Sequence, residues 1–482
     1  MKIFSKNQGP GQNLKIAFIH YHLKTGGVTT VLRQQIESIL DTCELLVLSG
    51  EPPESSLPCD VVHIPGLGYD ISGRNLMEPE SVATAVIETI HSKWKNGCDL
   101  VHVHNPTLKK NANFLKILNV LNKRGLKLFL QIHDFAEDGR PLAYFPDEEY
   151  IENCHYGVIN SRDYNILLKT GLKKEGLHKI FNTITPFHFN TKDVFFKNYI
   201  LYPIRAIRRK NIGEAILLSL FFKKNAPLVI TLPPNSPTDI NSYENWKAFV
   251  MENKLNVIFE AGLTHDFSDL VLSSDFLITT SIAEGFGFSF LEPWTAKKKL
   301  WGRKLPDICH DFEQNSIRLN HLYTRLDVPM DWVDNDRLFY TWKLSIQKVC
   351  AAFGTTIDNI SIKIAYENIT KNDVIDFGLL SEPFQKKIIS TVLSGSANRK
   401  KLIRLNPFLS NPGSVSNKGA LIQNNMEAVL FNYNQPKYRK KLIDIYTKAV
   451  KDNVCQKIDK KILLSEFFKL NNFSLLKWCD NA

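Results

Sequence analysis

The sequence predicts an α/β protein with two domains, each built on a parallel sheet that helices cover on both faces. Short apolar runs alternate with segments of helical periodicity in two series, one before and one after a less regular stretch at 185–198. A chain of 482 residues is also too long for one ordinary hydrophobic core. Two large domains facing each other across a central cleft are therefore expected.

The first series begins with the apolar run from Leu14 to His20, which a Gly26-Gly27 loop and a helical pattern follow. Runs rich in Val, Ile, Leu and Phe predict further strands at 44–48, 60–64, 99–104 and 126–132, and helical periodicity marks 81–94 and 108–123. This alternation predicts a parallel sheet.

The second series predicts strands at 199–202, 228–232, 256–260 and 275–280, with helices at 211–222, 242–252 and 266–272. Open parallel sheets bind ligands beyond the carboxyl ends of their strands. The loops that follow these strands are therefore where a functional site is expected.

The remainder is less regular until a late helix. Periodicity weakens at 305–434, and 436–450 returns to a helical pattern with Tyr438, Leu442, Ile445 and Tyr446 on one side. The expected organisation is a tail at 1–13, a first domain at 14–195, a second domain at 196–435 with an elaboration near 320–430, and a helical segment at 436–482 that packs on the first domain.

Composition limits the class of protein. With 44% hydrophobic and 23% charged residues, the chain is globular and not disordered or fibrous. The net charge of +11 is compatible with nucleic acid, an anionic membrane surface or small polyanions, but the basic clusters are short and lack interleaved aromatic residues. Eight cysteines without a C-x-x-C pair, no signal peptide and no apolar membrane span predict a reduced, cytoplasmic protein without a zinc site.

The sharpest motif runs from Glu284 through Gly285-Phe286-Gly287 to Glu292, after the strand predicted at 275–280. Glycines let backbone N–H groups approach an anionic or hydroxyl-rich ligand. A helix beginning near Ser289 would add the positive end of its dipole and would place Glu292 in its first turn. The plain structural alternative is an acidic helix N-terminus without a ligand.

A second motif leaves the strand predicted at 199–202 and contains Arg205 and Lys210. Two cations aimed at one pyrophosphate would neutralise a leaving group as its charge develops. Arg208 or Arg209 could supply the phosphate contact instead, and a solvated basic loop is the structural alternative.

These motifs resemble the family-4-type retaining GT-B glycosyltransferases, over about two thirds of the chain. The E-x7-E mark of that family is matched by Glu284 and Glu292, and its G-R-x4-K-G segment by Arg205 and Lys210. This sequence departs from the segment where Pro203-Ile204 replaces one glycine and Asn211 the other.

The resemblance implies a fold and a set of roles. The fold would be GT-B, with two Rossmann-like αβα domains facing a cleft and a C-terminal helix that crosses back to the first domain. Glu292 would hold the ribose hydroxyls, and Glu284 would hold hydroxyls of the transferred hexose. Arg205 and Lys210 would bind the donor diphosphate, beside the backbone of Gly285, Phe286 and Gly287.

In the first domain, Gly26-Gly27 resembles the family's N-terminal glycine loop, which approaches the diphosphate; a plain turn is the alternative. His133 ends the strand at 126–132, where the resemblance implies a histidine beside the donor sugar and the leaving phosphate. His102 and His104 share one face of their strand, and either could reach the cleft or remain a core histidine.

The implied chemistry is an internal return, in which the donor phosphate accepts the proton of the acceptor while Arg205 and Lys210 stabilise the departing diphosphate. A nucleotide-diphosphate sugar would be the co-substrate, with no tightly bound cofactor and no required metal. Glu284 could also act directly, because a carboxylate beside an oxocarbenium-like centre stabilises it.

The acceptor hydroxyl is left open among a small sugar or sugar acid, a glycan and a lipid. His22, Lys24, Asp138 and Arg140 lie on loops of the first domain and could line its pocket. Arg140 is the candidate contact if the acceptor is anionic, as a phosphorylated sugar acid is.

Four alternatives stay open. Asp334-Asn335-Asp336 matches the D-x-D of GT-A enzymes, but no apolar strand precedes it. A sugar-nucleotide epimerase would bind the same donor and turn it over without an acceptor. A polyanion-binding protein would explain the charge but not the paired glutamates, since carboxylates repel phosphate, so no nucleic-acid partner is expected. A peripheral membrane contact suits glycosyl transfer to a lipid.

Overall fold

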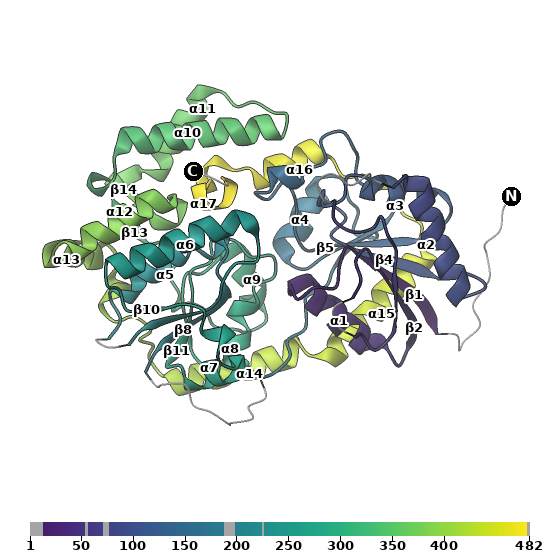
Figure 1. Cartoon of the computed structure of the whole chain (residues 1–482), viewed down its shortest axis with the longest axis horizontal. Helices are drawn as coiled ribbons and strands as arrows, with labels where there is room; N and C mark the ends of the chain where they lie inside the picture. The colour runs from purple at the N-terminus through teal and green to yellow at the C-terminus, as the bar shows by residue number, and fades with distance from the viewer. Residues whose placement is uncertain (1–12, 54–55, 71–76, 188–197, 224–225, 480–482) are drawn as a thin grey trace. The chain divides into compact units, whose positions relative to one another are not determined.

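The computed structural model describes residues 13–53, 56–70, 77–187, 198–223 and 226–479 of the chain (Figure 1). The chain divides into two compact units. The first comprises Met1–Thr183 and Gln435–Leu464, and the second comprises Ile184–Asn434 and Ser465–Ala482.

The first unit is built on a seven-stranded parallel sheet in the order β3-β2-β1-β4-β5-β6-β7. Its strands are β1 (Leu14–His20), β2 (Cys43–Ser49), β3 (Asp60–His63), β4 (Leu100–His104), β5 (Leu128–Ile132), β6 (His155–Val158) and β7 (Leu177–Lys179). The order runs outward from β1 in both directions, so the winding of the chain reverses between β1 and β4. Such a reversal is where open α/β sheets place their ligands.

Helices cover both faces of this sheet. The helices of the first unit are α1 (Gly27–Ile39), α2 (Pro79–Lys93), α3 (Phe114–Lys123), α4 (Ser161–Lys169) and α15 (Gln435–Lys451), and α16 (Lys460–Phe467) begins in it. Figure 1 shows α1 and α15 on the side of the sheet away from α2 and α3.

The late helix completes the core of the first unit. Ile16 and Phe18 of β1 are buried in one cluster with Leu32 of α1 and Leu442 of α15. The predicted apolar side of the segment 436–450 is confirmed, because Tyr438, Leu442, Ile445 and Tyr446 are its buried residues together with Ala449. The return of the chain to the first unit, expected for a GT-B fold, is therefore present.

The second unit is built on a five-stranded parallel sheet in the order β10-β9-β8-β11-β12. Its elements are β8 (Ile200–Arg205), α5 (Ile212–Ser219), β9 (Leu228–Leu232), α6 (Pro237–Glu252), β10 (Val257–Ile258), α7 (Phe267–Ser273), β11 (Phe276–Thr279), α8 (Glu292–Thr295), β12 (Leu300–Gly302) and α9 (Pro306–Gln314). Here the winding reverses between β8 and β11.

The segment that lacked clear periodicity is mostly helical. It contains β13 (Asp327–Pro329), α10 (Asn335–Ala352), α11 (Asn359–Ile369), β14 (Val374–Asp376), α12 (Glu382–Leu393), α13 (Ser396–Leu405) and α14 (Lys418–Asn432), and α17 (Leu475–Trp478) lies near the end of the chain. The strands β13 and β14 form a separate antiparallel pair. Single 3-10 turns lie at Pro141–Ala143, Arg208–Lys210, Ala261–Leu263, Phe288–Phe290, Met330–Trp332, Lys371–Asp373, Phe377–Leu379, Pro407–Ser410 and Leu470–Asn472.

Two predicted elements are shorter than expected. The helix predicted at 108–123 begins at Phe114, because Asn111 holds the preceding residues in a loop by donating to the carbonyls of Gly66 (2.7 Å) and Gly68 (2.8 Å). The strand predicted at 256–260 is reduced to Val257–Ile258, and Glu260 adopts a left-handed conformation with φ 65°. Hydrogen bonds from distant residues and local turns override the periodicity at these points.

Candidate functional site

Topology brings two of the predicted site residues together in the second unit. The adjacent strands β8 and β11 are parallel, with Ile200 opposite Phe276, so the loops after them leave the same edge of the sheet. Lys210 follows β8 and Glu284 follows β11. Both therefore lie where the winding reverses, the usual ligand position in such sheets.

Lys210 and Glu284 form a close ion pair, with 2.5 Å between Nζ and Oε1. Their side chains are 16% and 10% exposed. Burial by itself raises the pKa of the Glu284 carboxyl, but the charges of Lys210 and Arg209 and hydrogen bonds from Lys210 and Ser281 bring it below its ordinary value. Glu284 is thus ionised at neutral pH.

The backbone at Lys210 is held by neighbouring strands. Its carbonyl accepts hydrogen bonds from the hydroxyls of Tyr202 (2.6 Å) and Thr280 (3.0 Å). Asn211 follows with φ 52° and ψ 56°, in the left-handed region that glycine enters freely and asparagine tolerates better than most residues. The departure of Asn211 from the family's glycine therefore preserves the backbone conformation.

Glu292 lies in the same electrostatic environment. It opens α8, directly after the 3-10 turn Phe288–Phe290 and Leu291. Burial raises the pKa of Glu292 to about 7, and the charge of Lys210 partly opposes this. Both glutamates of the E-x7-E motif therefore feel the charge of Lys210.

The glycine loop between the two glutamates is fixed by packing. Gly287 has φ 92°, and a Cβ added there would lie 2.9 Å from Cδ2 of Phe290 and 3.1 Å from Cγ2 of Ile308. The buried ring of Phe286 packs edge-on against Phe312. Ser289 places a buried hydroxyl in this loop that makes no hydrogen bond with the described residues. The loop therefore has a closely packed backbone and one buried hydroxyl without a hydrogen bond to the described residues.

The three arginines at the end of β8 and after it have different contacts. Arg205 donates to the carbonyl of Pro233 (3.1 Å), and Arg208 donates to the carbonyls of Leu475 and Cys479. Arg209 lowers the pKa of Glu284 by its charge. Arg209 thus accompanies Lys210 beside Glu284, and the diphosphate contact of Arg205 stays a prediction.

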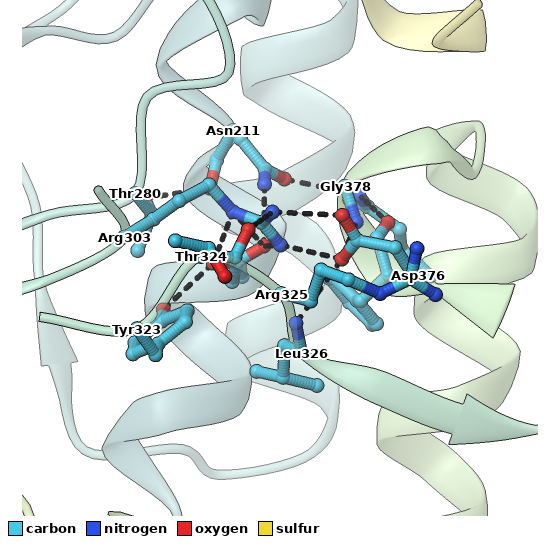
Figure 2. A network of polar contacts seen from close by, with 12 residues as sticks. Asn211, Thr280, Arg303, Tyr323, Thr324, Arg325, Leu326, Asp376 and Gly378 are labelled. Carbon is cyan, nitrogen blue, oxygen red and sulfur yellow. Dashed lines mark hydrogen bonds and ion pairs between the residues drawn. The ribbon is translucent and has the colours of Figure 1, made fainter. Parts of the chain in front are cut away.

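A buried network of polar contacts around Arg303 was not predicted from the sequence (Figure 2). The guanidinium of Arg303, just after β12, donates to Glu214 (2.6 Å from Nη2) and to both carboxylate oxygens of Asp376 (2.7 and 2.8 Å). Tyr323 donates to Glu214 at 2.7 Å. The side chain of Arg303 is 4% exposed and that of Glu214 is fully buried.

The network reaches the loop that carries Lys210. Asn211 donates to Glu214 (2.8 Å) and accepts from the amide of Gln385 in α12 (3.0 Å). The elaboration of the second unit, whose role the sequence left unassigned, therefore supports the backbone beside Lys210. An arginine directly after an apolar strand and a glycine was the one sequence signal of this network.

In the first unit, Gly26 and Gly27 lie where α1 begins. Gly26 precedes the helix in an extended conformation, and its carbonyl accepts from the backbone N–H of Thr30 (3.0 Å). A glycine is therefore not required there by backbone strain. The contact of this loop with a diphosphate stays a prediction.

His133 follows β5 and is buried. Its Nε2 lies 2.9 Å from Nδ1 of His104, and its backbone N–H donates to the side chain of Asn105 (2.7 Å). Burial lowers the pKa of His133 to about 4, so the imidazole is neutral at pH 7. His102 is a core residue that pairs with Gln131 (2.9 Å) and Tyr446 (2.8 Å).

The four residues predicted to line the acceptor pocket lie on loops of the first unit, and each has a polar partner. Their partners are Tyr69 for His22 (3.2 Å), Glu51 for Lys24 (2.5 Å), Arg162 for Asp138 (3.0 Å) and Asp134 for Arg140 (2.7 Å). Tyr69, with its ring beside His22, was not predicted from the sequence.

Two further features bear on the alternatives. Asp334 of the D-x-D string caps α10 by accepting from the backbone N–H of Arg337 (3.1 Å), which is a structural role. Within the described ranges, no three His, Cys, Asp or Glu residues gather as metal ligands. No helix there is long and apolar enough to cross a membrane.

Comparison with known proteins places the fold. No protein family model matches this chain. The chain is 27% identical over 416 residues to the mannosylglucosyl-3-phosphoglycerate synthase of Petrotoga mobilis, covering 76% of this chain and 79% of that protein. A glycosyltransferase from Rickettsia africae superposes with a TM-score of 0.51 at 12% identity, over 92% of this chain and 100% of that one. TarM gives 0.52 at 10%, over 91% and 99%.

The two parallel-sheet units and these neighbours define a GT-B fold, as the sequence predicted. The predicted resemblance to GT-B glycosyltransferases is likewise confirmed. Similarity to the Petrotoga synthase adds a relationship in sequence to the likeness in fold.

Proposed function

We propose that this chain is a retaining, family-4-like glycosyltransferase, which moves a hexose from a nucleotide-diphosphate sugar to a hydroxyl acceptor. The observation that carries the proposal is the buried Lys210–Glu284 pair at the winding reversal of the second sheet, with Glu292 under the same charge. An ammonium suits a diphosphate, and carboxylates suit the hydroxyls of a sugar and a ribose. One cluster therefore holds the groups that a nucleotide sugar needs.

In the proposed reaction, the bond between the anomeric carbon and the diphosphate breaks, and its electron pair leaves with the diphosphate. The charges of Lys210 and Arg209, joined by Arg205, stabilise the negative charge that develops there. The acceptor oxygen forms the new bond on the same face and gives its proton to the donor phosphate. Glu284 remains ionised beside the oxocarbenium-like centre and orients the hexose.

The backbone of Gly26 and Gly27 and the imidazole of His133 complete the proposal from the first unit. A neutral His133 would offer a hydrogen bond to the hexose, because its Nε2 is engaged by His104 and its Nδ1 is the other ring nitrogen. No tightly bound cofactor and no metal are part of this mechanism.

Among the three acceptor classes, a small anionic acceptor is the first to test. The relative's name describes a synthase whose product carries mannosyl, glucosyl and 3-phosphoglycerate groups. We propose the same class of acceptor here, with a glycan and a lipid as the other classes.

Binding of the donor is tested by thermal unfolding with UDP-, GDP- and ADP-sugars. A ligand at a hundred times its dissociation constant adds about 2.7 kcal/mol of stability. One donor is expected to stabilise the wild type, and Lys210→Ala and Glu292→Ala should lose the shift while remaining folded. Lys304→Ala is the matched control, since Lys304 is also 16% exposed and pairs with Glu313 at 2.6 Å.

Two results would contradict the donor site. The first is that no sugar nucleotide stabilises the wild type, and the second is that Lys304→Ala loses as much of the shift as Lys210→Ala. An epimerase is separated by turnover, because it converts the donor without an acceptor. The anomeric configuration of the product, read by NMR, tests retention.

A further inference from the structure

Four loops of the first unit meet at the winding reversal of its sheet. The loops follow β1, β3, β4 and β5, and they carry His22, Tyr69, Lys110 and Arg140 respectively. Because β1 and β4 are parallel neighbours, their following loops leave the same edge. This edge of the first sheet is equivalent to the one that carries Lys210 in the second.

These loops are tied to one another by buried hydrogen bonds. The side chain of Asn105 accepts from the backbone N–H groups of His133 (2.7 Å) and Asp134 (3.2 Å), which joins the loops after β4 and β5. Tyr21 donates to the carbonyl of Leu108 (2.8 Å), which joins the loops after β1 and β4.

The loop after β3 is tied to the same structure. The backbone N–H of Asp70 donates to the carbonyl of Lys110 (2.8 Å), and the carboxylate of Asp70 accepts from the N–H of Ala112 (2.7 Å). The positions of Lys110 and Tyr69 relative to each other are thereby set by backbone contacts. Side chains on such supports need little reordering to bind a ligand.

The two cations at this edge are paired differently. Arg140 pairs with Asp134 at 2.7 Å, and Lys110 lies with its ammonium 5.7 Å from the ring centre of Tyr69. Among the described residues, the Lys110 ammonium has no carboxylate within 4 Å. Partial desolvation and the charge of Arg140 lower the pKa of Lys110, and Asp134 only partly opposes them. The exposed Lys110 ammonium is therefore available to an anion on a rigid polar edge.

We propose that Lys110 and Arg140, with the hydroxyl of Tyr69, form a subsite for the anionic group of the acceptor, a phosphate monoester or a carboxylate. This inference rests on the proposed function for its place in catalysis. Arg140 uses one of its five N–H groups on Asp134, so its planar fork keeps donors for a second anion. Lys110 supplies a point charge from another loop, and Tyr69 a neutral donor.

The subsite predicts a selectivity between acceptors. A phosphate or carboxylate would be bound by both cations, whereas a neutral sugar would lack both of these contacts. Sites built to bind a polar group reject analogues that lack it more strongly than apolar pockets reject a missing methylene. Phosphorylated or acidic acceptors should therefore be preferred over neutral glycosides.

Direct binding tests the subsite without catalysis. Calorimetric titration of the full chain with 3-phosphoglycerate should show binding to the wild type. We expect Lys110→Ala and Arg140→Ala each to weaken it by about tenfold or more, because each removes a hydrogen bond to a charged group. Lys116→Ala is the matched control, since Lys116 is an exposed lysine of the same unit, 55% exposed. Absence of binding to the wild type, or equal affinities for wild type and Lys110→Ala, would overturn the subsite.

A second measurement separates the subsite from the donor site. The thermal shift given by a sugar nucleotide should be the same for Lys110→Ala and the wild type. With that donor, Lys110→Ala should raise KM for a glucoside of 3-phosphoglycerate and should not raise KM for the neutral glucoside of glycerol. Equal losses with both acceptors would overturn the subsite while leaving the transferase intact. If no sugar nucleotide stabilises the wild type, the proposed function is overturned. Titration with 3-phosphoglycerate would still show whether the anion subsite exists.

A lipid headgroup could carry the same phosphate chemistry. Vesicles of phosphatidic acid and phosphatidylcholine provide that arm of the experiment. If the wild type binds these vesicles, Lys110→Ala does not, and neither protein binds 3-phosphoglycerate, the proposal of a small anionic acceptor is overturned.

Discussion

Replacing Arg303 by methionine should destabilise the second unit strongly. The substitution keeps a long side chain but leaves the buried carboxylates of Glu214 and Asp376 without their cation. Breaking a buried ion pair by removing one partner costs roughly 3–5 kcal/mol. Tyr323 still donates to Glu214, and the N–H groups of Leu326 and Gly378 still donate to Asp376, so the lower end of that range is expected.

The loss should depend on pH in a defined direction. In the wild type, burial raises the pKa of Glu214 against the opposing charge of Arg303, and Arg303 holds the pKa of Asp376 below its ordinary value despite burial. Without the guanidinium, both folded-state pKa values should lie above the unfolded ones. Such groups destabilise the fold at high pH and are relieved as protons bind on acidification. The difference between Arg303→Met and wild type should therefore shrink between pH 8 and pH 5.

Urea unfolding at both pH values measures this difference. Arg325→Met is the control, because Arg325 pairs with Asp327 at 2.8 Å but is 49% exposed, and exposed pairs contribute about 0–1 kcal/mol. Since Glu214 also bonds Asn211 beside Lys210, the thermal shift by a sugar nucleotide should weaken in Arg303→Met as well. A loss below about 1 kcal/mol, or one that is equal at pH 5 and pH 8, would refute the reasoning.

Three further substitutions probe the loops of the donor site. The stability of Glu292→Gln relative to wild type should increase by up to about 3 kcal/mol as pH rises from 4.5 to 7, measured by urea unfolding. The reason is that the raised pKa of Glu292, about 7, destabilises the folded wild type in this pH range. A difference that does not change with pH would contradict this prediction. Asn211→Ala should unfold at a lower temperature than Asn211→Gly, since both lose the side-chain hydrogen bonds but only alanine is strained at φ 52°; the reverse order would be inconsistent with the left-handed backbone. Gly287→Ala should lower both the melting temperature and the shift by sugar nucleotide, because its Cβ meets Phe290. Gly395→Ala, with open space around its Cβ, should leave the shift by sugar nucleotide unchanged.

Much of the fold could be predicted because its signals are local. Buried parallel strands appear as apolar runs, so β1 was expected at its observed bounds and most other strands within a few residues. Lys210, Glu284 and Glu292 were singled out by motifs that resemble those of a glycosyltransferase family, and only the structure shows that the strands before their loops, β8 and β11, are neighbours.

The parts that sequence reasoning missed depend on contacts between distant residues. Arg303 lies 89 residues from Glu214 and 73 from Asp376 in the chain, and no local pattern reports such a pairing. In the sequence, the only sign of the left-handed backbone at Asn211 was that the resembling motif has a glycine at this position. Lys110 and Tyr69 carried no motif, and the order of strands in the sheet was needed to bring their loops together.

The first unit is assembled from two stretches of chain that are far apart in the sequence and are therefore synthesised at different times. Gln35 of α1 donates to Tyr438 (2.9 Å) and His102 of β4 pairs with Tyr446 (2.8 Å), so polar contacts beside an apolar cluster join α15 to both α1 and the sheet. Until the ribosome has delivered Gln435–Lys451, Phe18 and Leu32 remain uncovered by that helix. A nascent or truncated chain that stops before this helix would expose an apolar surface, and we expect it to depend on chaperones or to aggregate.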